Sequence, residues 1–124
     1  MRVLETDIED WVVKEAEALG IPSLKLNLRG NRGWPDRIFL IRGGRPLFIE
    51  FKRPGEEPRK LQLQRHRILR KLGYEIQVHD DREEALAGLK AAQARGGRGA
   101  AAAGHRAEVE PARLHEEGRQ VPAR

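Results

Sequence analysis

Hydrophobic residues at helical spacing open the chain and predict a first helix over residues 6–19. The apolar face of this helix consists of Ile8, Trp11, Val12, Ala16 and Leu19. Thr6 is the predicted N-cap, with Glu9 three residues later as its capping-box partner. Gly20 ends the helix, and leucines that alternate with polar residues over 24–28 then predict a half-buried strand.

Two further strands are predicted around a glycine turn. A nearly continuous apolar run over residues 36–42 gives the second strand, and Gly43-Gly44 gives the turn. The third strand covers residues 46–52 and is apolar on both faces from Leu47 to Ile49. We therefore expect this strand at the centre of the sheet. The glycine-rich stretch 30–35 is a predicted loop.

A second helix is predicted over residues 59–72, and a fourth strand over 74–79 is followed by a last helix over 82–91. The resulting order, α-β-β-β-α-β-α, predicts an α/β fold in which helices flank a central mixed sheet. The residues of the second helix that are expected to face inward are Leu61, Ile68, Leu69 and Leu72.

The composition changes at about residue 92, where large apolar side chains become rare and alanine, glycine, arginine and glutamate dominate. Such a segment has too little apolar surface to build a core. The sequence therefore predicts one folded domain over residues 1–91 and a disordered tail over 92–124.

Charge is distributed unevenly along the chain, whose net charge is +5. Residues 25–71 hold 14 lysines and arginines against four acids, whereas residues 1–24 hold two basic and six acidic residues. A basic middle indicates a polyanionic partner such as nucleic acid, with an ordinary solvated surface as the alternative. Cysteine is absent, which excludes disulfides and thiolate metal sites and fits a reducing compartment. No apolar run is long enough to span a membrane.

Three charged residues in the second and third strands have the side chains that phosphodiester hydrolysis needs. The reaction uses a metal ion, carboxylates that hold it, and a cation near the attacking water or the transition state. Glu50 and Lys52 lie two positions apart on one strand and therefore share a face, while Asp36 opens the neighbouring strand. Charges in so apolar a strand favour a functional site over a surface ion pair. The four histidines show no ligand spacing, so a histidine metal site is not expected.

The length of the glycine turn decides whether Asp36 can join Glu50. With a strict two-residue turn, Asp36 falls opposite Phe51 and faces away from Glu50. A three-residue loop places Asp36 opposite Lys52, on the same face as Glu50. A catalytic site therefore requires an odd-length loop, a bulge, or an Asp36 that is twisted off its strand.

These motifs resemble a VRR-NUC domain, a branch of the PD-(D/E)XK nuclease superfamily with a restriction-endonuclease-like core. The resemblance covers residues 5–90. Each motif is short and weak alone, but their order and spacing within this frame are specific. The matching residues are Gly33-x-Pro35-Asp36-Arg37, Phe48-Ile49-Glu50-Phe51-Lys52, Gln62, Gly73 and the Ile8-Glu9 pair.

The resemblance implies a metal site for Mg²⁺ or Mn²⁺. Asp36 and Glu50 would be its carboxylate ligands, with the backbone carbonyl of Phe51 as a further ligand. Glu9 is similar to the first-helix glutamate that completes such a site through water. Glu5, one turn earlier on nearly the same helix face, is an alternative to Glu9.

The same resemblance makes Lys52 the catalytic lysine, acting with Asp36 and Glu50. It also makes Gln62 a helix-borne glutamine close to the reacting groups. Gln64 is an alternative to Gln62, although Gln64 is more consistent with a position facing solvent or DNA.

Basic residues around the two motifs are expected to contact DNA phosphates, and each contact would add to the salt dependence of binding. Trp34, next to these motifs, is a candidate for stacking on a base or covering the site, and core packing is an equally open alternative. No base-reading element is evident, which favours recognition of DNA shape over sequence. The predicted phosphate contacts are Arg29, Arg32, Arg37, Arg53, Arg59, Lys60 and Arg65.

The predicted function is that of a metal-dependent DNA endonuclease that acts on branched DNA such as four-way junctions. Compact members of the superfamily resemble Holliday-junction resolvases and act as homodimers in phages and bacteria. The resemblance therefore implies a homodimer in a bacterial or phage-infected cytoplasm, without an organic cofactor. The alternatives are a DNA-binding module that has lost catalysis and a sequence-specific restriction or nicking enzyme.

Overall fold

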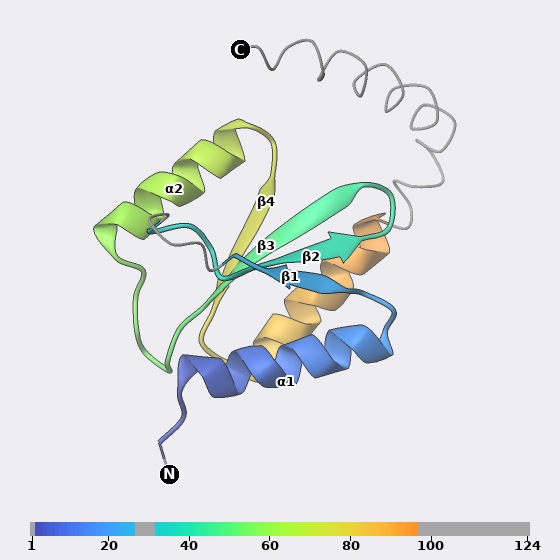
Figure 1. Ribbon diagram of the computed structural model, residues 1–124, viewed down its shortest axis with the longest axis horizontal. Coiled ribbons are helices and arrows are strands. Elements are labelled where there is room, and N and C mark those ends of the chain that lie inside the picture. Colours follow the sequence, from blue (N-terminus) through green and yellow to red (C-terminus); the bar gives the residue numbers. More distant parts are fainter. Residues whose placement is uncertain (1, 27–31, 97–124) are drawn as a thin grey trace.

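The computed structural model describes residues 2–26 and 32–96. The element order α-β-β-β-α-β-α is confirmed, and Figure 1 labels the elements from α1 to β4 in chain order. The elements are α1 (Glu5–Ala18), β1 (Ser23–Lys25), β2 (Arg37–Ile41), β3 (Arg45–Phe51), α2 (Lys60–Lys71) and β4 (Glu75–His79), followed by a last helix over residues 82–96.

The four strands form one mixed sheet in the order β1-β2-β3-β4. β2 pairs antiparallel with β1 and with β3, whereas β4 pairs parallel with β3 after the α2 crossover. β3 lies inside the sheet, and its residues from Leu47 to Phe51 are all buried. The prediction of a central strand that is buried on both faces is therefore confirmed.

The β2–β3 connection is a three-residue loop over 42–44, because Ile41 pairs with Arg45. Both of its glycines have positive φ, +95° at Gly43 and +71° at Gly44. The ladder ends at Arg37 opposite Ile49, so one further step places Asp36 opposite Glu50. The odd-length loop is thus confirmed, with a pairing shifted from the expected one in which Asp36 faces Lys52. Both pairings put Asp36 on the face of Glu50.

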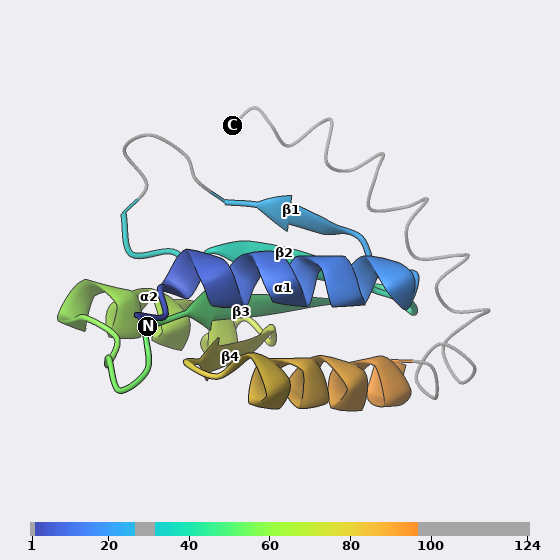
Figure 2. The same ribbon diagram turned by 90° about the horizontal axis from the view of Figure 1, so that it is seen from below.

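Helices cover the two faces of the sheet unequally, as the two ribbon views show (Figures 1 and 2). The main core lies between one face of the sheet, α1 and the last helix. A smaller cluster on the opposite face joins Phe48 and Ile76 to Leu69 of α2. The large core consists of Ile8, Val12, Ala16, Ile21, Phe39, Ile41, Leu47, Ile49, Phe51, Ala85, Leu89 and Ala92.

The start of α1 differs from the predicted capping box. Leu4 is the N-cap residue, and its backbone N–H donates to Asp7 Oδ2 at 2.9 Å. The prediction of Thr6 as N-cap with Glu9 as its partner is therefore wrong. Asp7 takes the role because it stands three residues after the true cap, and its charge also favours the positive end of the helix.

The inward face of α2 also differs from the prediction. Of the four residues expected inside, only Leu69 is buried, while Leu61 is 38% exposed and Leu72 69% exposed. The other buried residue of the helix is His66. The helix turns this polar side inward because the part of β3 beneath it carries charged side chains rather than apolar ones.

The last helix continues beyond the expected end at residue 91 and is described as far as residue 96. Ala92 is 4% exposed and belongs to the main core, which explains why the helix continues. The predicted disordered tail lies outside the described residues from 97 onward.

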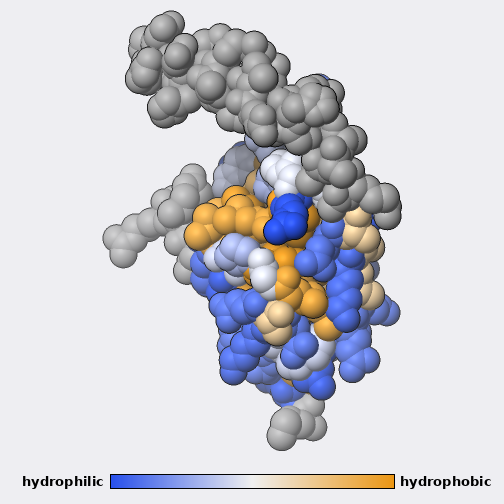
Figure 3. All heavy atoms as spheres, turned by 90° about the vertical axis from the view of Figure 1, so that its right-hand side faces the viewer, coloured by the Kyte–Doolittle hydropathy of each residue, from blue (hydrophilic) through white to orange (hydrophobic). Residues whose placement is uncertain are grey.

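A hollow of about 420 Å³ opens at the end of the molecule where α1 stops. Its lining includes Leu19, Ile21 and Arg42, and Figure 3 shows hydrophobic side chains gathered on this side of the molecule. This end carries the β2–β3 turn and therefore lies away from Asp36 and Glu50 along the strands. Among the described helices, none is both long enough and apolar enough to cross a membrane.

Replacement of Asp7 tests the observed helix start. We expect Asp7→Ala to lower the free energy of unfolding by about 0.5–1 kcal/mol, because the Leu4 N–H loses its acceptor and the helix end loses a favourable charge. Urea denaturation of the full chain measures this change. The control Thr6→Ala should change stability by no more than about 0.5 kcal/mol. A larger loss for Thr6→Ala than for Asp7→Ala would restore the predicted capping box.

Candidate active site

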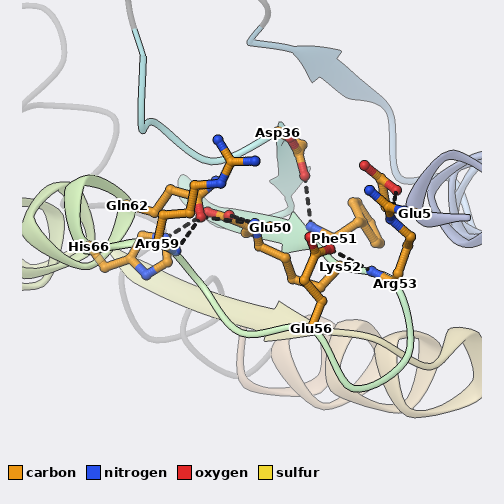
Figure 4. Close-up of polar contacts among 10 residues, drawn as sticks. All are labelled: Glu5, Asp36, Glu50, Phe51, Lys52, Arg53, Glu56, Arg59, Gln62 and His66. Atoms are coloured by element: carbon orange, nitrogen blue, oxygen red, sulfur yellow. Dashed lines mark hydrogen bonds and ion pairs between the residues drawn. The ribbon is translucent and has the colours of Figure 1, made fainter.

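Four polar side chains from β3 and α2 converge in a buried cluster, drawn in Figure 4. Glu50 and Lys52 stand two positions apart on β3 and its continuation, so they point to the face that α2 covers. Gln62 and His66 stand four positions apart on α2, on one side of the helix. Lys52 contacts Gln62 and Glu50 contacts His66, so two side-chain contacts join β3 and its continuation to α2.

Glu50 has no exposed surface, and its two carboxylate oxygens have different surroundings. Oε1 lies 2.8 Å from His66 Nε2, in contact with a ring that is itself 1% exposed. Oε2 lies 3.0 Å from Lys52 Nζ as an ion pair but takes part in no hydrogen bond of the described residues. A buried carboxylate oxygen without a hydrogen bond is costly unless a cation satisfies it.

Lys52 Nζ also donates to Gln62 Oε1 at 2.8 Å. The same oxygen of Gln62 accepts the backbone N–H of Arg59 at 2.7 Å, at the start of α2. The structure thus places Gln62 against the catalytic lysine that the sequence predicts, whereas Gln64 is exposed. Because an ammonium group has three N–H donors, the hydrogen bond to Gln62 leaves Lys52 further donors for a water or a phosphate oxygen.

Asp36 precedes β2, and its Oδ2 accepts the backbone N–H of Phe51 at 2.7 Å. Burial is the largest influence on this carboxyl group and raises its pKa from 3.8 to about 6. The Phe51 hydrogen bond opposes the rise, whereas the neighbouring charges of Glu50 and Glu9 add to it. The pKa of Asp36 is therefore raised mainly because burial disfavours the charged carboxylate, and the nearby acids add to this effect.

Glu9 is buried on the other side of the sheet from Glu50, at the side covered by α1. Its Oε2 accepts from Lys25 Nζ at 2.8 Å and from Arg37 Nε at 2.7 Å. The described residues hold no group of three carboxylate, histidine or cysteine side chains arranged to bind a metal. Glu9 is therefore not placed to bind a metal ion directly together with Asp36 and Glu50. The alternative residue Glu5 pairs with Arg53 at 3.2 Å.

The groups around β3 nevertheless fit a hard divalent cation. Mg²⁺ is bound in many enzymes by one or two carboxylates together with water and substrate phosphate. Asp36 and Glu50 offer carboxylate oxygens, of which Glu50 Oε2 has no hydrogen bond. The N–H of Phe51 points toward Asp36, so its carbonyl, which projects to the same side of the strand, is a further oxygen nearby.

The predicted phosphate contacts lie in different surroundings. Arg32 and Arg59 are exposed and line a hollow of about 330 Å³ next to Gln62. Lys60 is also exposed, at the first position of α2. Arg29 lies outside the described residues.

Two other predicted contact residues are already engaged within the protein. Arg37 bonds Glu9 on the face away from Glu50, and it also donates to Ser23. Arg65 lies over the Trp34 ring, with its guanidinium carbon 4.9 Å from the ring centre. Trp34 is half-buried and packs against the smaller core cluster, which agrees with the alternative of core packing.

His66 is the site residue that the sequence does not reveal. Its interval from Gln62 is one helical turn, and this interval is the only signal in the sequence that it might share a face with a site residue. The apolar pattern of α2 pointed to other positions as the inward ones. The contact with Glu50 joins residues 16 positions apart and depends on how α2 lies across β3.

Comparison with known proteins agrees with this fold. No established family profile matches the sequence. The chain is 37% identical over 84 residues to a protein named "Putative nuclease p44" from Acyrthosiphon pisum secondary endosymbiont phage 1, a match that covers 67% of this chain and 90% of the phage protein. A solved structure titled "VRR_NUC domain" is similar with a TM-score of 0.59 and 28% identity, over 64% of this chain and 87% of that chain.

A four-stranded mixed sheet with a buried Glu-x-Lys pair at its centre and an aspartate beside it defines a nuclease-type α/β domain. The chain belongs to the VRR-NUC nuclease family.

The raised pKa of Asp36 predicts how the stability of the metal-free protein depends on pH. The folded protein binds this proton more tightly than the unfolded chain, so the stabilisation is present below about pH 4 and is lost as the pH rises through about 6. We expect Asp36→Asn, in EDTA, to raise the free energy of unfolding at pH 8 by on the order of 1 kcal/mol, after allowance for partial exposure. Urea denaturation should show little change at pH 4.

Asp10→Asn on the exposed side of α1 is the matched control, and its effect on the free energy of unfolding should be the same at both pH values. An effect of Asp36→Asn that is the same at pH 4 and pH 8 would contradict the assignment.

Proposed function

We propose that the protein is a divalent-metal-dependent DNA endonuclease that hydrolyses phosphodiester bonds in branched DNA. The observation that carries the proposal is the buried Glu50–Lys52 pair. Glu50 Oε2 has no hydrogen bond within the described part of the chain, and Asp36 stands on the same face. A buried acid and base that served only stability would be expected to satisfy both oxygens. The membership of the VRR-NUC family supports the same reaction class.

The residues of this chain divide the work at the reacting phosphate. Asp36 and Glu50 would hold Mg²⁺ or Mn²⁺ together with the Phe51 carbonyl. When bound, such an ion lowers the pKa of a coordinated water and offsets charge on the phosphate. Lys52 would direct a free N–H donor at the attacking water or a phosphate oxygen, because the Gln62 hydrogen bond and the Glu50 ion pair fix its position.

Glu9 supports the site from a distance in this proposal. Its charge raises the pKa of Asp36, and its own carboxylate is held by Lys25 and Arg37. A water-mediated contribution to the metal site, as the family resemblance implies, remains compatible with this position.

The surroundings of the cluster support a DNA substrate. The hollow that Arg32 and Arg59 line adjoins Gln62, so a phosphate bound there would lie next to the catalytic lysine. Guanidinium groups bind phosphate with two parallel N–H donors. These contacts would read the backbone, which favours selection by DNA shape. We place the protein in the compartment of that DNA, the cytoplasm of a bacterium or of a phage-infected cell.

Branched DNA is preferred in the proposal because the family resemblance implies a homodimer. Two copies would present two active sites to opposing strands of a junction. Duplex cutting at a single motif is the alternative activity, and binding without cutting is the alternative function.

Cleavage of labelled four-way junctions, flaps and duplexes with Mg²⁺ or Mn²⁺ tests the proposal. We expect junction cutting by the wild type, in paired nicks on opposing strands, and a loss of at least about 100-fold for Asp36→Ala. Glu57→Ala replaces an exposed carboxylate of the loop before α2 and should keep wild-type activity.

Different outcomes separate the alternatives. Binding of the junction without cutting under either metal would favour the non-catalytic module. Cutting of random duplexes at one sequence would favour a restriction or nicking enzyme, and equal activity of Asp36→Ala and wild type would remove the proposed site.

Salt dependence tests the phosphate contacts separately from catalysis. In the Asp36→Ala background, Arg59→Gln and Lys60→Gln should each weaken junction binding and reduce the slope of log affinity against log salt by about 1. Fluorescence anisotropy at a series of salt concentrations measures the slope. Arg42→Gln, at the opposite end of the sheet, is the control and should leave it unchanged. An unchanged slope for both Arg59→Gln and Lys60→Gln would exclude them as phosphate contacts.

A further inference from the structure

His66 makes the closest contact to Glu50 from outside β3. Its Nε2 lies 2.8 Å from Glu50 Oε1, and the two side chains are each 1% exposed. Glu50 is ion-paired with Lys52, and an ionised carboxylate can only accept hydrogen bonds, so we assign the hydrogen of this contact to Nε2. The bond is shielded from water because both side chains are buried. Its direction is from the Nε2–H of His66 to Oε1 of Glu50.

The contact is part of a matched arrangement between α2 and β3. Gln62 to His66 is one turn of helix, an advance of about 6 Å. Lys52 to Glu50 is two residues of strand, an advance of about 6.7 Å. Because the two advances nearly agree, α2 can hold Lys52 with one side chain and Glu50 with the next. The helix thus engages both members of the Glu-x-Lys motif at once.

The two contacts have different consequences for the two oxygens of Glu50. Oε1 is occupied by His66, and Oε2 has the Lys52 ion pair but no hydrogen bond. A carboxylate that is held at one oxygen cannot rotate to exchange its two oxygens without breaking that bond. Removal of a group that orients a metal ligand in this way typically weakens metal binding about 10–100-fold.

We propose that His66 is a positioning residue: its Nε2–H fixes Glu50 Oε1 and thereby keeps Oε2 available to a divalent cation. The inference rests on the proposed metal-dependent function. It assigns no proton transfer to His66, which contacts neither substrate nor metal and acts through Glu50. It also explains why α2 directs a histidine inward where apolar packing alone would favour leucine or isoleucine.

A purely structural histidine would make the same bond, because any buried carboxylate requires a partner. The two roles differ in one measurable respect. If His66 only stabilises the fold, its loss lowers stability and leaves the metal affinity of the folded protein unchanged. If His66 positions Glu50, its loss weakens metal binding in protein that is still folded.

The experiment compares two nearly isosteric substitutions in the full chain. His66→Gln keeps an N–H donor close to the position of Nε2, and His66→Met fills similar space without a donor. Mn²⁺ affinity is measured without DNA by titration calorimetry, and urea denaturation in EDTA reports the folded fraction of each variant. Arg67→Met, at the next position but exposed to solvent, is the control.

We expect His66→Met to weaken Mn²⁺ binding about 10–100-fold and His66→Gln to restore most of it, with Arg67→Met equal to wild type. If His66→Met does not fold, His66→Asn provides the comparison, because its donor is too short to reach Oε1 and should give the same loss. Wild-type affinity in a folded His66→Met or His66→Asn variant would overturn the inference alone. Absence of Mn²⁺ binding by the wild type would overturn the metal-dependent function and this inference together.

Discussion

The ion pair between Glu50 and Lys52, buried in the central strand, constrains the rest of the domain. Two charges that leave water lose solvation worth several kcal/mol each, and their attraction offsets this loss only if further polar partners are present. Those partners are His66 and Gln62, and both come from α2. The helix must therefore turn a polar side to the sheet and leave residues such as Leu72 exposed.

This constraint divides the molecule into two parts with different physical roles. The face of the sheet under α1 and the last helix carries nearly all of the buried apolar side chains and supplies the hydrophobic stabilisation. The face under α2 has only a three-residue apolar cluster beside the charged groups. Stability from one face thus supports an arrangement on the other that would not fold by itself, as functional sites commonly require.

Asp36 and Glu9 show how charge is balanced across the two faces. Glu9 is held by two cations, Lys25 and Arg37, whereas Asp36 has a single backbone donor and a raised pKa. Asp36 is therefore the less compensated of the two carboxylates, mainly because burial removes it from water and it has no cation bonded to it among the described residues. The same pairing explains why Arg37, a basic residue next to the motif, faces the interior and Arg32 and Arg59 remain at the surface.

Local periodicity and short motifs are enough to predict the element order and the central strand. They also mark Asp36, Glu50, Lys52 and Gln62 as candidate site residues. The alternation of side chains along strands left a catalytic site three options: an odd-length loop, a bulge, or an Asp36 twisted off its strand. The structure has the odd-length loop. Tertiary packing sets the pairing of Asp36, the rotation of α2, the partners of Glu9 and the contact of His66 with Glu50. Apolar periodicity locates the side of a helix that avoids water, but it cannot identify a polar side that is buried because charged residues distant in sequence lie beneath it.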